Sequence, residues 1–203
     1  MKPNSALINN MVRSAMVVLA AGMAAFTTGC MTANIKVSPT ARIQNAPDKK
    51  IALSVGLMLD DRFCTNRFLP FSGGQTYPFG TTLKQQSISL CEQCFERVIV
   101  STNGVVPAGV NAILTPEMHR CGIGYAASGG GQDITLLLQW TLGTGDNRNI
   151  LWMTTVDGHA NGGRSKVFQL LFDDLATKSC RAFQESPEIR QLTSQAQRKP
   201  GAN

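Results

Sequence analysis

The chain has 203 residues, of which 19 are lysine or arginine and 13 are aspartate or glutamate, so its formal net charge is +6. The basic residues are scattered along the chain and do not cluster with aromatic residues, which argues against a nucleic-acid-binding surface. Hydrophobic residues make up 43% of the sequence, which is enough for one globular domain with a sizeable core.

The first 30 residues contain the parts of an export signal. Arg13 precedes an apolar stretch of 12 residues at positions 15–26, and the small residues Thr28 and Gly29 come directly before Cys30. A stretch of this length is too short to remain as a membrane-spanning helix, which needs about 18 apolar residues. The layout resembles the signal of bacterial lipoproteins, in which an acylated cysteine follows the cut. An ordinary secretory signal cut between residues 24 and 32, and a core helix, stay open as alternatives.

The lipoprotein resemblance implies that residues 1–29 are removed and that Cys30 is lipidated. In such lipoproteins an aspartate after the cysteine retains the protein in the inner membrane, so Met31 at that place implies the outer membrane. Residues 30–48 are polar, contain Pro39 and Pro47, and show no sustained period of two or 3.6. They predict a flexible tether with an end-to-end distance of about 25 Å, which would let the folded body stand away from the bilayer.

Past the tether, alternating apolar residues from Ile51 to Leu59 predict a strand with one buried face. Residues 60–80 follow as a loop that is too long for a simple turn. Two interpretations of this loop are open: it packs on the domain, or it binds a partner through aromatic anchors. The candidate anchors are Phe68, Phe71, Tyr77 and Phe79.

A helix is predicted next, beginning near Thr82, because Thr82 and Gln85 have the spacing of a capping box. A short β-branched strand is predicted at residues 97–101. A further strand is predicted at residues 112–114 with a continuation over residues 118–126. Pro116 between them would place this strand at a sheet edge or end it.

A hairpin and a helix complete the body. Residues 134–142 and 150–156 alternate between apolar and polar and predict the two strands of the hairpin. Residues 159–164 predict a loop, and Ser165 is a candidate cap for an amphipathic helix over residues 168–183. Residues 187–203 predict a frayed polar tail.

These elements predict an α+β fold, a two-layer sandwich in which a mainly antiparallel sheet carries two amphipathic helices on one face. The single domain is expected to span residues 49–186. The order of the elements over residues 50–183 is similar to that of small envelope-assembly lipoproteins of the LptE type. This resemblance implies a non-enzymatic accessory protein bound to an envelope complex, and it carries over no functional residue except Cys30.

The remaining cysteines predict disulfides, because an exported protein folds in an oxidising compartment. Their number is odd, so at least one thiol stays free or pairs with another chain. The pairing is not determined by the sequence, although two separate bridges from the predicted helix, one to the loop and one to a later element, suit the spacing. The candidates are Cys64, Cys91, Cys94, Cys121 and Cys180.

The cysteines also allow two other kinds of site. Two helix cysteines and two strand residues could form a tetrahedral zinc site from Cys91, Cys94, His119 and Cys121. His119 and Cys121 are two positions apart and would share a strand face. The spacing of Cys91 and Cys94 is also that of a thiol-redox motif. Such a motif needs its first cysteine at a helix start, where the dipole lowers the thiol pKa, and here that cysteine falls well inside the helix.

Hydrolase chemistry has weaker support. Ser128, Asp157 and His159 could be named as nucleophile, acid and base, but Ala126 stands where a nucleophile elbow has its first glycine. The glycines at 129–131 lack the lysine of a phosphate-binding loop. We therefore expect no catalytic residue and no cofactor.

Two functional hypotheses follow. The leading one is an outer-membrane-anchored periplasmic lipoprotein that acts as a non-enzymatic accessory or assembly subunit of an envelope complex in transport, secretion or surface assembly. Its partners would be the membrane, through the lipid, and an envelope protein complex, with no nucleic acid. The alternative is a small periplasmic metal-binding or thiol-redox protein that uses the cysteine and histidine residues.

Overall fold

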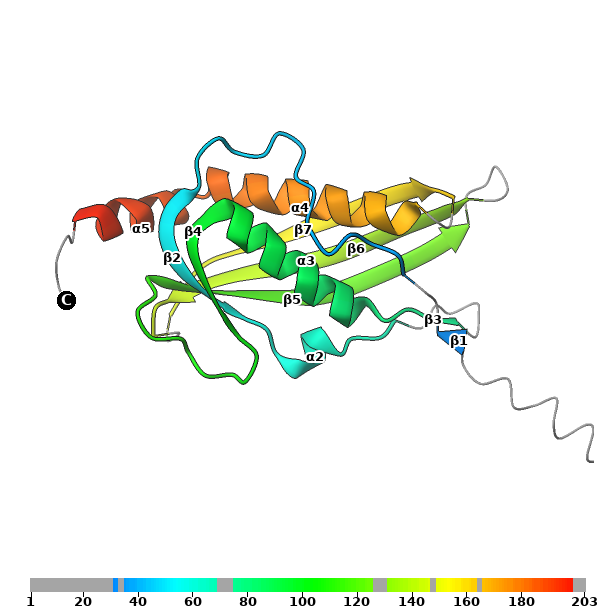
Figure 1. Cartoon of the computed structure of the whole chain (residues 1–203), viewed down its shortest axis with the longest axis horizontal. Coiled ribbons are helices and arrows are strands. Elements are labelled where there is room, and N and C mark those ends of the chain that lie inside the picture. Colours follow the sequence, from blue (N-terminus) through cyan, green and yellow to red (C-terminus); the bar gives the residue numbers. More distant parts are fainter. Residues whose placement is uncertain are drawn as a thin grey trace, which may run out of the picture.

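The computed structural model describes residues 31–32, 35–68, 75–125, 131–146, 149–163 and 166–198. The strands are β1 (Met31–Thr32), β2 (Ile51–Met58), β3 (Gln75–Thr76), β4 (Phe95–Ser101), β5 (Ala112–Tyr125), β6 (Gln132–Thr144) and β7 (Ile150–Gly162). The helices are α2 (Asp61–Cys64), α3 (Phe79–Cys94), α4 (Val167–Glu185) and α5 (Pro187–Arg198). Figure 1 shows α3 and α4 across one face of the sheet, with β1 and β3 at one end of the molecule and α5 at the other.

The main sheet is mixed and has the strand order β4-β2-β5-β6-β7. Strand β2 runs parallel to both of its neighbours, β4 and β5, whereas β5, β6 and β7 form an antiparallel meander. The parallel pair of β2 and β4 follows from the crossover through α3, which returns the chain to the same direction. The antiparallel hairpin predicted from the alternating residues is confirmed by β6 and β7, and the small strands β1 and β3 pair separately.

The alternation of β6 explains how the two layers pack. Its even-numbered residues from Ile134 to Leu142 are all buried beneath the helices, and Trp140 is fully enclosed. The apolar stripe of α4 covers them, with Phe172 and Phe183 buried against the sheet. The predicted α+β class, with both amphipathic helices on one face, is therefore confirmed.

One glycine lets α4 approach the sheet closely. A Cβ atom built on Gly158 of β7 would collide with the side chain of Leu175 on α4. Glycine has no side chain, so α4 can lie close to β7 at this position. The helix thereby covers β7, which is an edge strand of the sheet.

The 60–80 segment contributes to the core. Asp60 caps the short helix α2 by accepting a hydrogen bond from the Phe63 backbone, at 2.6 Å. Tyr77 and Phe79 are buried, and their rings contact Phe168 at centroid distances of 5.5 and 5.9 Å. The structure therefore favours the packed-loop interpretation for these two residues. Phe68 is partly buried against the same cluster, and Phe71 lies outside the described residues.

Two helix starts differ from the prediction. Helix α3 begins at Phe79, three residues before Thr82, and Pro78 precedes it without a side-chain cap. The capping box at Thr82 was therefore wrong, because the proline and the buried aromatic side chain of Phe79 set the start. Helix α4 begins at Val167 after Lys166, also without a side-chain cap, and Ser165 lies outside the described residues.

Three other boundaries are corrections. Strand β7 continues to Gly162, so His159 lies in a strand and not in a loop. Strand β5 does not end at Pro116, but its pairing with β2 stops at Leu114, so the proline has only β6 as a neighbour. The segment after Pro187 forms helix α5 in place of a frayed tail, because Ile189 is buried against the domain.

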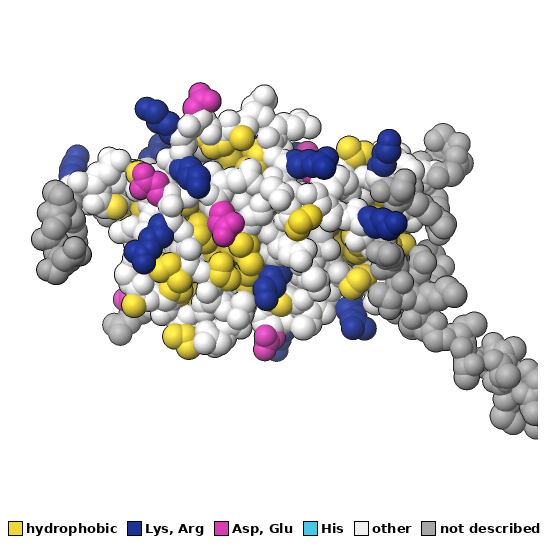
Figure 2. All heavy atoms as spheres, in the orientation of Figure 1, with side chains coloured by type: hydrophobic (Ala, Val, Ile, Leu, Met, Phe, Trp, Pro, Cys, Tyr) yellow, Lys and Arg dark blue, Asp and Glu magenta, His cyan; other side chains and the backbone are white. Residues whose placement is uncertain are grey.

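The surface of the helical layer carries charges of both signs. Figure 2 shows lysine and arginine side chains spread over this face and not gathered in one patch, with small apolar areas between them. Within the described part of the chain, no helix is long and apolar enough to cross a membrane.

Candidate functional site: an N-terminal strap between two helices

Residues 35–45, which we call the strap, run along the outer side of the helical layer between α3 and α4 (Figure 1, dark blue trace). Their backbone N–H and C=O groups are bound by side chains of both helices. The strap therefore has what a free linker lacks, namely hydrogen-bonding partners for its backbone at every third position, at Ser38, Ala41 and Gln44.

Helix α3 holds the strap with three polar side chains one turn apart. Ser89 Oγ accepts a hydrogen bond from the Ala41 backbone N–H at 3.0 Å. Gln93 Nε2 donates to the Ala41 carbonyl at 2.8 Å and to Ser89 Oγ at 3.2 Å, and Gln86 Nε2 donates to the Ser38 carbonyl. Both the backbone N–H and the backbone C=O of Ala41 are thereby hydrogen-bonded, and the residue is only 2% exposed.

Helix α4 binds the strap from the other side, and we call the polar side chains of α3 and α4 that bind the strap the groove. Gln169 Oε1 accepts a hydrogen bond from the Ser38 backbone N–H at 2.7 Å, and Gln169 is itself oriented by a bond to Asp173 at 2.6 Å. Thr177 Oγ1 accepts from the Gln44 backbone N–H at 3.0 Å and donates to the Asp173 carbonyl at 2.8 Å. These residues repeat every four positions along α4, so they form one polar line beside its apolar stripe.

The predicted flexible tether was wrong for the strap. Ile35, Val37 and Ile43 pack against the core cluster, and the polar residues between them face outward or bind the helices. This alternation is visible in the sequence, but residues 38–40, which include Pro39, interrupt it. The signal that sequence reasoning missed was the matching row of Gln, Ser and Thr residues on the two helices.

Backbone pairing with the body continues on the N-terminal side of the strap, up to the residue next to Cys30. Strand β1 pairs in parallel with β3, with Met31 opposite Gln75 and Thr32 opposite Thr76. Cys30 itself lies outside the described residues. The residue that directly follows it is therefore already part of a backbone pairing with the body.

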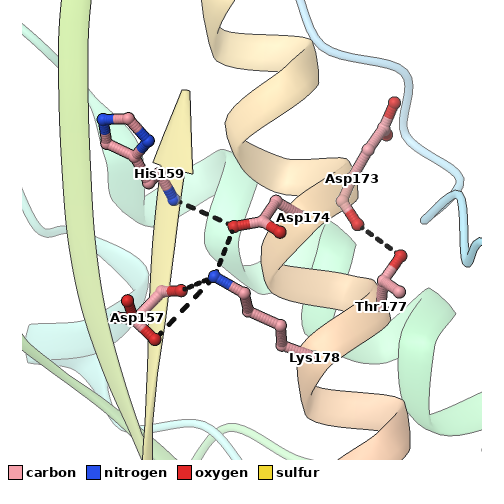
Figure 3. A network of polar contacts seen from close by, with 6 residues as sticks. All are labelled: Asp157, His159, Asp173, Asp174, Thr177 and Lys178. Atoms are coloured by element: carbon pink, nitrogen blue, oxygen red, sulfur yellow. Dashed lines mark hydrogen bonds and ion pairs between the residues drawn. The ribbon is translucent and has the colours of Figure 1, made fainter. Parts of the chain in front are cut away.

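The opposite flank of α4 binds the exposed edge of the sheet, as Figure 3 shows. Asp174 Oδ2 accepts a hydrogen bond from the His159 backbone N–H at 3.0 Å and lies 2.9 Å from Lys178 Nζ. Lys178 in turn donates to the Asp157 carbonyl at 2.7 Å. Side chains of α4 thus satisfy backbone groups of the edge strand β7, which would otherwise be open to pairing with another chain.

Three buried thiols lie under the groove. Cys94, the last residue of α3, has its sulfur 3.0 Å from the sulfur of Cys180 on α4, and Cys91 is buried one turn before Cys94. Burial raises the pKa of the Cys91 thiol. The hydrogen bond that Cys94 donates to Cys180 raises the pKa of Cys94 and lowers that of Cys180. The structure has all five described cysteines as free thiols.

The structure does not bring the four zinc candidates together. Cys91 and Cys94 lie in the core, whereas His119 is on the open face of the sheet, where its Nε2 atom is 2.7 Å from Gln139. His119 and Cys121 were expected to share a strand face, but the register shifts between Met118 and Arg120, and Cys121 packs against the core. Within the described ranges no cluster of three or more His, Cys, Asp or Glu residues could hold a metal ion.

The residues named as redox and hydrolase candidates are likewise not brought together into a catalytic arrangement among the described residues. Cys91 and Cys94 occupy the last turn of α3, the end at which the helix dipole disfavours a thiolate. His159 Nε2 lies 2.6 Å from Asp133, and Asp157 lies 3.8 Å from Lys178. Ser128 is outside the described residues. Cys64 and Cys121 are half-buried, and burial raises the pKa of Cys121 to about 12.

Comparisons with known proteins bear on the fold alone. Protein XCC0632 from Xanthomonas campestris, of family DUF330, has a similar structure, with a TM-score of 0.50, 12% sequence identity, and coverage of 81% of this chain and 100% of that one. No protein-family model matches this chain, and no curated protein matches it.

Two other solved structures have lower similarity. The PelC dodecamer from Paraburkholderia phytofirmans is 14% identical over 68% of this chain and 96% of its own, with a TM-score of 0.39. Lipoprotein GNA1162 from Neisseria meningitidis is 12% identical over 64% of this chain and 99% of its own, with a TM-score of 0.35. Likenesses at this level carry no conclusion about this chain.

Proposed function

We propose that the protein is a lipid-anchored envelope lipoprotein, acylated at Cys30 and held on the periplasmic side of the outer membrane as a non-enzymatic accessory subunit of an envelope complex. The observation that carries the proposal is the ordered N-terminal segment. The backbone is paired from Met31 and bound again through the strap, so a lipid on Cys30 would be attached almost directly to the folded body.

This geometry gives the anchor a definite direction. Strands β1 and β3 lie at one end of the molecule and α5 at the opposite end (Figure 1). A lipid on the residue before β1 would therefore hold the β1–β3 end against the headgroups. Three acyl chains, each methylene contributing about 0.8 kcal/mol, make such attachment effectively irreversible.

The end that carries α5 would then point away from the membrane toward a partner. It contains a pocket of about 470 Å³ between α5, the end of α4 and the start of β2, with Lys49, Lys50 and Arg190 among its lining residues. We assign to this end the contact with the envelope complex. The polar residues of α3 and α4 have a structural task in this proposal, since they hold the strap and the sheet edge, and we assign no catalysis to them.

The anchor is tested by mass spectrometry of the N-terminal peptide from protein purified out of bacterial membranes. We expect a peptide that begins at Cys30 and carries acyl mass, in the outer-membrane fraction. The variant Cys30→Ala should lose the acyl mass, whereas Cys121→Ala should keep it. A native N-terminus at another residue, without acyl mass, would contradict the proposal.

The accessory role is tested by site-specific photo-crosslinking in cells. A photoreactive residue at Thr193, in the α5 pocket, should capture one discrete envelope protein, and Cys30→Ala should abolish the capture. The matched control is the same residue at Thr135 on the open face of the sheet. Capture of no envelope protein from Thr193, or equal capture from both positions, would count against this role.

A further inference from the structure

We propose that Cys94 and Cys180 form a disulfide that joins the end of α3 to α4 beneath the strap. The two sulfurs are 3.0 Å apart. They need to approach by only about 1 Å to reach the bonding distance of about 2.05 Å. The inference rests on the proposed export, because an oxidising compartment is where such a bond forms and persists.

The surroundings single out this pair among the five cysteines. Cys94 and Cys180 are 0% and 2% exposed, and they come from two helices whose outer sides bind the strap. The Ala41 and Gln44 backbones are bound beside them, by Gln93 and Thr177 respectively, and Cys180 also lines a small pocket under Gln44. A bond at this point would fix the spacing of α3 and α4 and with it the width of the groove.

The chemistry is thiol–disulfide exchange with an oxidised dithiol protein of the envelope. A thiolate of this chain attacks the donor disulfide, which forms a mixed disulfide and releases one donor thiolate. The second cysteine then displaces the donor, so that two thiols become one S–S bond and the donor leaves as a dithiol that has gained two electrons and two protons.

The folded protein shields both sulfurs from a protein oxidant, so the exchange belongs to the folding stage. Once α3 and α4 have packed, the same shielding protects the bond from reduction. Cys91 is the competing thiol, one turn away and equally buried. The sulfur that lies 3.0 Å from the sulfur of Cys180 is that of Cys94, so the packing of α3 on α4 favours Cys94 over Cys91 as the partner.

The decisive measurement is a cross-link map of the full-length protein, expressed with its leader, trapped in acid and alkylated before digestion. Cleavage with trypsin and a glutamate-specific protease separates Cys91 from Cys94 at Glu92 and releases Cys180 in a short peptide. We expect Cys94 linked to Cys180, with Cys64, Cys91 and Cys121 alkylated. A map with Cys94 and Cys180 alkylated in exported protein, or with Cys91 linked to Cys180, overturns the inference.

Stability provides the second readout. The variants Cys94→Ala and Cys180→Ala should each lower Tm by about 5–15 °C, and the double variant should lower it no further, since one bond is lost in all three. Wild type that is reduced in denaturant and refolded in reductant should lose most of its difference in Tm from the variants. Cys91→Ala is the matched control, and its Tm should respond to reductant as wild type does. Equal Tm values for the oxidised wild type and for wild type that was reduced in denaturant and refolded in reductant would contradict the bond.

Failure of export is distinguishable from failure of the bond, because the same digest contains the N-terminal peptide. If that peptide shows an uncleaved leader, the purified protein is unfolded and refolded in a glutathione redox buffer. Cys94 and Cys180 should then link selectively. Absence of the link under those conditions overturns the inference independently of where the protein resides.

Discussion

The two sides of the α3–α4 layer differ in chemistry and in what they determine. The inner side is apolar and packs large side chains such as Phe172 and Phe183 against the sheet, where Phe183 meets the buried Trp140 of β6. The outer side is a polar groove in which Gln, Ser and Thr residues bind the backbone of the strap. Burial of apolar area is non-directional, whereas hydrogen bonds are specific for position. The inner side therefore supplies stability, and the outer side sets where the N-terminus leaves the body.

The strongest test of the inner side is Trp140→Ala. Trp140 is fully buried, its ring meets Phe183 at 5.1 Å, and its Nε1–H donates to Ser179 at 2.9 Å. We expect the free energy of unfolding to fall by about 3–5 kcal/mol, measured by urea denaturation. Trp152→Ala, at a partly exposed site, is the matched control and should cost clearly less. Equal losses would mean that the core is not centred on Trp140.

A smaller effect on the same side is expected for Gly158→Ala. The added methyl group would collide with Leu175 and push α4 away from β7, which should cost about 1–3 kcal/mol in unfolding free energy. Gly122→Ala in β5, where a Cβ atom meets nothing within 4 Å, is the control and should change stability little. Thermal unfolding of the two variants side by side decides the matter, and equal Tm values would refute the close approach.

The outer groove is tested by the double variant Ser89→Ala and Gln93→Ala. It removes the side chains that bind the Ala41 backbone, so the strap should detach locally while the domain stays folded. Loss of about 1–2 kcal/mol of local stability should raise the rate of tryptic cleavage after the exposed Arg42 by roughly 5–30-fold. Ser194→Ala, which removes an exposed hydroxyl from α5, is the control. An unchanged cleavage rate would show that the strap is held by other contacts.

The smallest effect is expected at the sheet edge. Asp174→Ala removes the acceptor of the His159 N–H and the partner of Lys178, both at a partly exposed site. We expect a loss of at most about 1 kcal/mol in unfolding free energy, part of which added salt should also remove from the wild type. Glu117→Ala on the open face is the control. A loss above that of Gly158→Ala would mean that this polar network, and not packing, holds α4 on β7.

Several elements could be predicted from the sequence because their signal is local. The alternation of Ile134 to Leu142 and the stripe of α4 each contain the complete information for one buried face. Helix starts were less predictable, since Phe79 begins α3 through burial of its ring and not through a cap. Helix α5 was missed because its few apolar residues, among them Ile189, acquire a partner only in the folded domain.

The candidate site was less accessible to sequence reasoning, for a physical reason. Cys94 and Cys180 are separated by 86 positions, and nothing in the spacing distinguishes this pair from other pairings of the five cysteines. The sequence placed His119 and Cys121 on one strand face, and a bulge between Met118 and Arg120 overturned that placement. A bulge depends on the pairing with β6 and has no signature in β5 itself.

By itself, the sequence determined the α+β class, the hairpin, the order of the main elements and the basis for expecting an acylated Cys30. These depend on residue periodicity and on short motifs, which the chain carries whatever its tertiary structure. Only the tertiary structure decided that residues 35–45 are bound and not free, and that two of five thiols are in contact. Both depend on bringing α3 and α4 together, because each helix provides half of the groove and half of the thiol pair.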